Sequence, residues 1–266
     1  MITGSVLGLF IGALLGLTGA GGGILAVPAL MFGLGMDLRQ AAPVALVAVG
    51  MAAATGAVQG LRQGAVRYKA AALMAILGGV TAPLGVALAQ RLPSGLLSGL
   101  FAAIMLLVAW RMIRQSRPRA SVAPSDDERE KACRISPRTG RFVWSRKVAA
   151  TLGSIGAFSG ICTGMLGVGG GFIIVPALDH FSELRMHSIV PTSLMVIALV
   201  SAATVGIAAA HGLSLPPAAW GFVAAAVVGM GVGRGLAPRL SPFILQRGFA
   251  TLCIVVAAVL MLRAAG

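Results

Sequence analysis

Charged residues are scarce in this sequence: they make up 11% of its 266 residues, whereas hydrophobic residues make up 58%. Soluble domains carry roughly 25% charged residues, so a chain this apolar does not fold as one soluble globule. Apolar runs recur along it, each near the ~20 residues that a membrane-spanning helix needs. The runs are continuous and do not alternate with a period of two, which argues against a β-barrel. The composition therefore predicts an all-α polytopic membrane protein.

Cysteine is also rare, and its placement argues against a disulfide framework or a metal site. Cys133, Cys162 and Cys253 show no CxxC spacing, and the last two lie in apolar runs. The sequence also lacks a nucleophile motif such as GxSxG. We therefore expect no enzyme activity, no cofactor and no metal.

Acidic residues are the scarcer charged group, with seven in the chain against 21 Lys and Arg. They are Asp37, Asp126, Asp127, Glu128, Glu130, Asp179 and Glu183. None falls in the middle of a full-length apolar run, where a cation transporter usually places its carboxylates. A path without carboxylates suits an anion, because like charges repel strongly at low dielectric.

Basic residues are abundant and concentrated in one polar segment. The formal net charge is +14, and eleven of the 21 Lys and Arg lie between Arg111 and Lys147, whereas the others sit singly at the ends of apolar runs. Membrane proteins place the charge that sets their topology in this way, so nucleic acid is not expected as a partner. We interpret the segment 115–147 as a solvated cytoplasmic linker, with binding to anionic lipid as the alternative.

Two glycine-rich stretches reveal an internal duplication. "GAGGGILAVPAL" at 19–30 returns as "GVGGGFIIVPAL" at 167–178, an offset of 148. The same offset relates further glycines, prolines and other residues from position 8 to about 109 without a gap. Chance does not hold one register over that length. The sequence therefore predicts two repeats, 1–114 and 148–266, on either side of the linker.

The apolar segments within the repeats allow two topologies. We expect helices at about 3–18, 24–35, 39–60, 69–90 and 95–114, and again at about 151–166, 172–183, 187–210, 217–238 and 246–264. The first two segments of each repeat are too short to span comfortably. They form either a re-entrant broken-helix hairpin followed by three transmembrane helices, which inverts the second repeat, or one broken span. The second option gives four plus four spans with discontinuous first helices and parallel repeats.

The distribution of charge favours the inverted arrangement. With the linker in the cytoplasm, the re-entrant topology puts six further basic residues inside (Arg62, Arg67, Lys69, Arg185, Arg239 and Arg247) and three outside (Arg39, Arg91 and Arg263). The broken-span topology puts four inside and five outside, against the positive-inside rule. We therefore expect inverted repeats with both termini in the periplasm.

The glycine breaks form the candidate substrate site. Non-helical backbone survives at membrane depth only when it is buried in protein or faces a water-filled cavity. A helix that starts there offers free N–H groups and a partial positive charge, and glycine lets a ligand approach the backbone. Two such helix starts that meet would hold a small anion. The glycines concerned are Gly21, Gly22, Gly23, Gly169, Gly170 and Gly171, whereas Gly8, Gly12, Gly16 and their counterparts are assigned to helix packing.

Other polar residues and prolines join the candidate site. The hydroxyls near the breaks or the matching prolines are Thr18, Thr163, Thr192 and Ser193, each of which can instead bond to its own helix. Arg234 either attracts the anion or extends to the cytoplasmic interface. The expected structural hinges are Pro28, Pro43, Pro176 and Pro191.

These residues resemble the TauE/SafE family, also called the sulfite exporter or toluene-sulfonate uptake permease family. The resemblance rests on the duplicated G-x-G-G-G-x-x-x-x-P-x-L and on Pro43 and Pro191, and it covers all but the linker. One departure is "APVAL" in the first repeat where the second has "PTSL". Hydroxyls beside Pro43 are therefore absent, and we expect an asymmetric site.

The resemblance implies a secondary transporter in a bacterial inner membrane. Its substrate would be a small sulfur-containing or organic anion, such as sulfite or a sulfonate, moved by alternating access and held at the paired helix starts. The alternative is a passive anion channel. The other expected partners are a coupling proton or cation, membrane lipid and a second copy of the chain.

Overall fold

The computed structural model of the chain describes residues 2–19, 22–115, 133, 142, 144–184, 186–210, 212, 216–237 and 242–265. In these residues the regular structure is helical, apart from an isolated β-bridge between Cys133 and Ser182. The first half of the chain contains α1 (Ile2–Thr18), the 3₁₀ helix η1 (Gly22–Leu25), α2 (Ala26–Gly33), α3 (Leu38–Arg62), α4 (Tyr68–Arg91) and α5 (Ser94–Gln115). The second half contains α6 (Arg146–Leu166), α7 (Gly171–Phe181), α8 (Met186–Ala210), α9 (Pro217–Leu236) and α10 (Pro242–Ala265).

Six of the described helices, α3, α4, α5, α6, α8 and α9, are long and apolar enough to cross a membrane. The fold is therefore that of an all-α polytopic membrane protein, as the composition predicts. Each predicted segment contains a helix, but α6 begins at Arg146 instead of 151 and has 21 residues. It starts early because the hydroxyl of Ser145 caps it, accepting a hydrogen bond from the N–H of Val148 at 3.2 Å. The prediction that this segment is too short to span is wrong.

α1 lies along α9 and α6 lies along α4, with glycines at both contacts. A Cβ atom added at Gly12 would lie 2.0 Å from the carbonyl oxygen of Ala226, and one at Gly160 would lie 2.1 Å from that of Gly78. The two pairs are related by the same offset of 148 that relates the sequences. Backbones approach this closely only where a side chain is missing, as at small residues in other membrane proteins. The packing role predicted for these glycines is confirmed.

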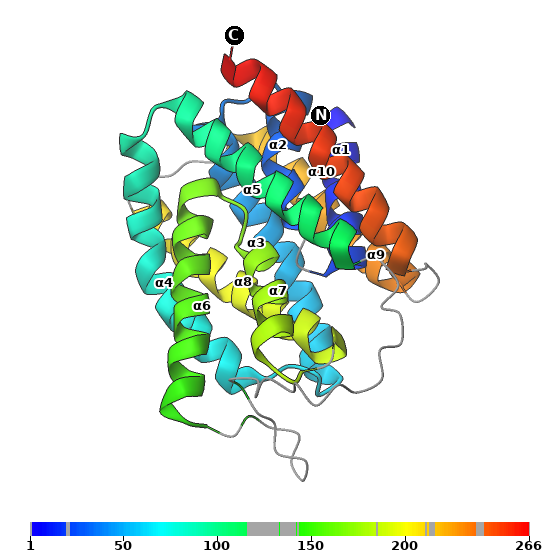
Figure 1. Ribbon diagram of the computed structural model, residues 1–266. Helices are drawn as coiled ribbons and strands as arrows, with labels where there is room; N and C mark the ends of the chain where they lie inside the picture. The colour runs from blue at the N-terminus through cyan, green and yellow to red at the C-terminus, as the bar shows by residue number, and fades with distance from the viewer. Residues whose placement is uncertain are drawn as a thin grey trace.

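The central helices α3 and α8 cross in opposite directions. Gly50 of α3 faces Ser201 of α8, and further along α3 Gly60 faces Pro191, so the contact advances along one helix while it retreats along the other. The two helices hold equivalent positions in the duplication. Equivalent helices that cross antiparallel are expected of inverted repeats and not of parallel ones. In Figure 1, α1 starts at one end of the molecule and α2 returns to that end, whereas α6 begins at the opposite end.

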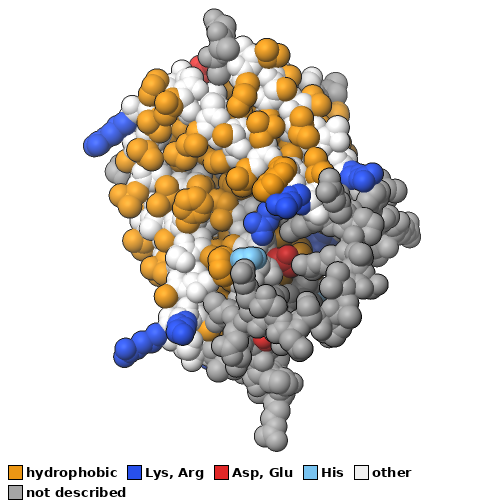
Figure 2. Space-filling view, in the orientation of Figure 1, with side chains coloured by type: hydrophobic (Ala, Val, Ile, Leu, Met, Phe, Trp, Pro, Cys, Tyr) orange, Lys and Arg blue, Asp and Glu red, His pale blue; other side chains and the backbone are white. Residues whose placement is uncertain are grey.

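Apolar side chains cover the outside of the bundle. Ile76, Val80 and Leu84 lie about one turn apart on the same face of α4 and are 64%, 69% and 64% exposed. Figure 2 shows hydrophobic side chains spread over most of the visible flank. Large exposed apolar surfaces mark protein or membrane contacts, and a flank of this extent is suited to lipid.

The segment between the two halves is described at few positions, and two of these are buried. Cys133 pairs with the end of α7, because its N–H donates to the carbonyl of Phe181 at 3.0 Å. Phe142 packs in the same apolar cluster as Cys133. Burial raises the pKa of the Cys133 thiol. The interpretation of a solvated linker therefore does not hold at these two residues, and most of the linker lies outside the described residues.

Replacing Gly12 with leucine should destabilise the protein, because the new side chain would collide with the backbone of α9. Overpacking of this kind costs about 1–3 kcal/mol, and more where backbone must move. Scanning fluorimetry of the purified protein in detergent should show a melting temperature several degrees below that of the native chain. The control is Gly231→Leu in α9, where an added Cβ meets no atom within 4 Å. Equal melting temperatures for the native and Gly12→Leu proteins would contradict the close contact.

Candidate functional site

The two glycine breaks meet inside the bundle. A Cβ atom at Gly23 would lie 3.0 Å from the carbonyl oxygen of Val168, so the first break touches the second. Val49 of α3 lies against both, because its Cγ1 is 3.0 Å from such an atom at Gly23 and 3.2 Å from one at Gly169. Gly23, Val168 and Gly169 are all buried. The two breaks that the duplication relates therefore form one buried junction.

The first break leaves little backbone free. The N–H of Gly22 donates to the hydroxyl of Thr18 at 2.9 Å, and that hydroxyl donates to the carbonyl of Leu14 at 2.7 Å. The expectation of a free N–H at Gly22 is therefore wrong. A Cβ at Gly22 would lie 2.4 Å from the backbone nitrogen of Leu15, so the turn against α1 requires glycine here. Gly21 lies outside the described residues.

The second break presents a helix start. Gly167, Gly169 and Gly170 all have positive φ, and Gly170, with φ +66°, is the N-cap of α7. The N–H groups of Gly171 and Phe172, in the first turn of α7, precede any carbonyl that could accept from them within the helix. The positive end of the helix dipole lies at the same place. This helix start therefore offers an anion two backbone donors.

Three buried hydroxyls surround the start of α7. Ser159 donates to the carbonyl of Gly170 at 3.2 Å, and Thr163 donates to the carbonyl of Ser159 at 2.7 Å. Ser201 of α8 is 1% exposed, and its Oγ has no hydrogen-bond partner among the described residues. This Oγ lies 3.7 Å from the place where a Cβ of Gly169 would stand. A buried hydroxyl without a partner is costly unless a ligand or a water satisfies it.

Sequence reasoning identified Thr163 but missed Ser159 and Ser201. The counterparts of these two serines in the first half, 148 residues earlier, are Ile11 and Ala53. Both serines could have been found from the sequence, because each is a hydroxyl residue in an apolar run whose counterpart in the other repeat is apolar. The same comparison shows that the polar side chains of the junction come mostly from the second half.

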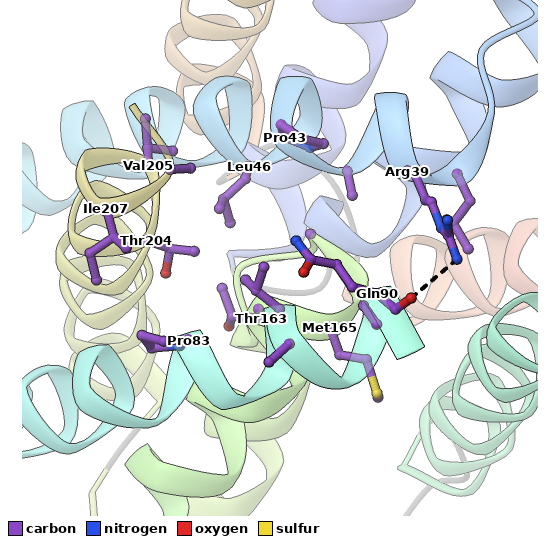
Figure 3. A pocket seen from close by; sticks show the side chains of 18 of the residues that line it. Arg39, Pro43, Leu46, Pro83, Gln90, Thr163, Met165, Thr204, Val205 and Ile207 are labelled. Carbon is purple, nitrogen blue, oxygen red and sulfur yellow. Dashed lines mark hydrogen bonds between the residues drawn. The ribbon is translucent and has the colours of Figure 1, made fainter. Parts of the chain in front are cut away.

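An open cavity leads from one face of the molecule to the second break. Its volume is about 720 Å³, and residues of α3, α4, α5, α6 and α8 line it. Thr163 and Gly167 connect it to the break, and Figure 3 shows Thr163 and Thr204 beside it on α6 and α8. Arg39 is the one charged residue among the described lining, and its Nη2 donates to the carbonyl of Gln90 at 3.5 Å. Largely apolar walls with a few polar groups and one cation suit a small anion.

Two of the predicted hydroxyls lie away from this cavity. Thr192 and Ser193 of α8 are fully buried, and they donate to the carbonyls of Ser188 and Val190 at 2.6 and 2.8 Å. The Thr192 hydroxyl also accepts a hydrogen bond from the N–H of Arg67 at 3.0 Å. All four predicted hydroxyls therefore donate to their own helices, which is the common alternative for Ser and Thr in a helix.

Arg234 and the predicted hinges are also placed by the structure. The guanidinium of Arg234 donates to the carbonyl of Gly56 in α3, and Arg234 is not among the residues that line the open cavity. The four prolines lie within helices: Pro28 in α2, Pro43 in α3, Pro176 in α7 and Pro191 in α8. Of these, Pro43 lines the open cavity.

Replacing Gly170 with alanine should destabilise the second break. The new Cβ would lie 2.0 Å from the Oγ of Ser159 and 2.7 Å from that of Thr163, and φ at this position is positive. Gly35→Ala is the matched control, because its φ of +65° carries the same backbone cost of about 1–2 kcal/mol but nothing lies within 4 Å. Scanning fluorimetry should therefore show a larger fall in melting temperature for Gly170→Ala than for Gly35→Ala. Adding Ser159→Ala should recover part of the difference, and equal falls without recovery would contradict the contact.

The chain is similar to a known protein family over nearly its whole length. The profile described as sulfite exporter TauE/SafE matches residues 5–260. Two proteins of Xylella fastidiosa, each described as a probable membrane transporter protein, are 29% (strain Temecula1 / ATCC 700964) and 28% (strain 9a5c) identical over 259 residues. Each match covers 96% of this chain and 93% of the relative. No solved structure matches the chain significantly. The chain therefore belongs to the sulfite exporter TauE/SafE family and is a membrane transporter.

Proposed function

We propose that this transporter is a secondary carrier that moves a small sulfur-containing or organic anion across a bacterial inner membrane by alternating access. The observation that carries the proposal is the open cavity, which reaches the second break at Thr163 and Gly167. The same break holds the start of α7, and the unpartnered hydroxyl of Ser201 lies against its Gly169. The description of the matching family, sulfite exporter, supports sulfite or a sulfonate as the substrate class.

Neutral donors would hold the anion at the end of this cavity. At the second break, the N–H groups of Gly171 and Phe172 and the hydroxyl of Ser201 would donate to it, and the helix start adds about half a positive charge. The hydroxyl of Thr163 can rotate about its Cβ–Oγ bond and donate to the anion instead of to its own helix. Arg39, in the cavity lining, would attract the anion from the water. A site of this kind binds an anion without a fixed counter-charge, which favours release.

Inverted repeats, each with a re-entrant hairpin and three transmembrane helices, are the topology that these contacts support. The antiparallel crossing of α3 and α8 is one support. A second is the pairing of Phe181, at the end of α7, with Cys133 of the linker, because it returns the α6–α7 hairpin to the linker side. With the linker in the cytoplasm, both termini face the periplasm. The open cavity then faces the periplasm too, because Arg39 lies at the start of α3 and Gln90 at the end of α4, and this topology puts both of these helix ends on the side opposite the linker.

Replacing Thr163 with valine should weaken anion uptake, because valine keeps the shape of threonine but removes the donor. We expect the KM for uptake into proteoliposomes to rise roughly tenfold, the effect of losing one hydrogen bond to a charged ligand. The anions to compare are sulfite, thiosulfate, sulfonates and carboxylates. The control is Thr151→Val on the same helix, whose hydroxyl likewise donates to its own helix, at 2.9 Å from the carbonyl of Lys147, but lies outside the cavity.

Two results would count against this proposal. An unchanged KM in Thr163→Val would remove Thr163 from the site. Ohmic anion conductance, with no accumulation that an uncoupler collapses, would identify a passive channel instead of a carrier driven by a proton or cation gradient.

A reporter fused after Gly266 should report the periplasm, because the proposed topology crosses the membrane with α3, α4, α5, α8, α9 and α10. In it α6, although long enough to span, returns with α7 to its own side, as α1 does with α2. Alkaline phosphatase, which is active in the periplasm, and green fluorescent protein, which fluoresces in the cytoplasm, form the matched pair of reporters. The same pair inserted after Arg129 of the linker should give the opposite result. A cytoplasmic C-terminus would overturn the re-entrant hairpins in favour of broken spans.

A further inference from the structure

The open cavity has a counterpart on the linker side of the molecule. The offset of 148 that relates the two halves also relates the cavity lining to a second set of residues. The counterparts of Pro43, Leu46, Val86, Thr204 and Ala208 are Pro191, Leu194, Arg234, Gly56 and Gly60. Both sets lie where α3 and α8 cross, near opposite ends of the crossing. The fold therefore contains two equivalent positions for a cavity, one at each end of the α3–α8 pair.

The position on the linker side is filled by close helix contacts. A Cβ atom at Gly60 would lie 2.4 Å from the Cβ of Pro191, so α3 and α8 touch there. A Cβ at Gly56 would lie 2.9 Å from the Cδ1 of Leu194 and 2.3 Å from the Cε of Met230. The equivalent positions at the other end of the pair, Thr204 and Ala208, carry side chains and line open space.

Arg234 ties the closed side together. Its guanidinium crosses from α9 to α3 and donates to the carbonyl of Gly56. A guanidinium bonded to a carbonyl is a charge-assisted hydrogen bond, which is stronger than a neutral one. The counterpart of Arg234 is Val86, whose side chain has no donor, so no equivalent bond holds α4 to α8 on the open side. A side-chain bond therefore joins α9 to α3 on the closed side, whereas on the open side the bond from Arg39 joins α3 to the end of α4 and leaves α8 free of it.

We propose that the chain has a second anion cavity at this closed position, and that Arg234 is the gate residue that keeps it closed while the periplasmic cavity is open. The proposal rests on the proposed alternating access and adds to it the lining of the second cavity and the bond that must break. When α3 and α8 separate at Gly56 and Gly60, the guanidinium of Arg234 loses its carbonyl partner and faces the new cavity. An anion in that cavity is then its natural partner, so gate opening and anion release are coupled.

Thiol labelling of single-cysteine reporters tests this inference in the full-length protein. The background replaces Cys133, Cys162 and Cys253 with alanine. One reporter is Ala208→Cys in the open cavity, and the other is Ala57→Cys beside the closed one, where the native side chain is 2% exposed. With Arg234 present, a membrane-permeant maleimide should label position 208 quickly and position 57 slowly.

Removal of the gate bond should reverse this pattern. In Arg234→Ala, labelling at position 57 should speed up about tenfold or more and labelling at position 208 should slow down, because labelling follows the population of each open state. Slower labelling at position 208 distinguishes a change between the two states from a loss of packing, because a loss of packing would not slow labelling at either position. Arg234→Met, which keeps the length of the side chain without its donors, should give the same reversal if the alanine variant is not recovered from membranes.

The matched control is Arg111→Ala. Arg111 also donates from its Nη2 to a backbone carbonyl, that of Pro176 at 2.9 Å, but it belongs to neither cavity. This variant should leave both labelling rates unchanged. Reversal in Arg111→Ala as well, or faster labelling at position 57 without slowing at position 208, would overturn the gate.

Anion uptake by the native chain separates this inference from the proposed function. Normal uptake together with unchanged labelling in both Arg234 variants would reject the gate and leave the carrier intact. A reversal of labelling in a protein that takes up none of the tested anions would support the gate and reject the substrate class.

Discussion

Each backbone N–H and C=O group that leaves a helix inside a membrane must find a partner within the protein, and the structure depends on how this is achieved at the two glycine breaks. At the first break the hydroxyl of Thr18 serves as both acceptor and donor, and the turn is closed. At the second break Ser159 satisfies the carbonyl of Gly170, but the first N–H groups of α7 and the hydroxyl of Ser201 are left for another partner. The two breaks therefore share a sequence pattern and differ in chemistry.

Glycine contacts decide which parts of the chain move together. The hairpin of the first half is held through Gly12 against α9 of the second half, and the hairpin of the second half is held through Gly160 against α4 of the first. Tight backbone contacts of this kind leave little room for sliding. A relative motion of the two halves therefore carries each hairpin with the helix of the opposite half. The α3–α8 crossing between them, where packing is tight at one end and open at the other, is where such a motion would be taken up.

The sequence predicts the helices and the glycine packing well, because apolar length and a repeated register are local properties. It predicts the side chains of the site less well. The hydroxyl of Ser201 matters because tertiary packing leaves it without a partner, and no local pattern carries that information. The bond from Arg234 to Gly56 joins residues 178 positions apart, so the sequence could place the charge but not its partner. The sequence predicts the start of α6 too late, because the apolar pattern does not include Arg146 and Lys147. Both residues belong to the helix, which is capped by Ser145.

Under the proposed alternating access, departures from the repeat would favour one of the two states. A fully symmetric duplication would give two states of equal free energy, in which the two halves exchange their conformations. Here Gly56 and Gly60 allow a close crossing that Thr204 and Ala208 do not, and Arg234 adds a bond that Val86 cannot make. Because about 1.4 kcal/mol changes a population tenfold, a few such differences suffice to favour one state. The serines of the second break have apolar counterparts in the first, so the anion would stay with one repeat while the path to it changes side. In the proposed mechanism, side chains that differ between the two repeats would thus separate binding from gating.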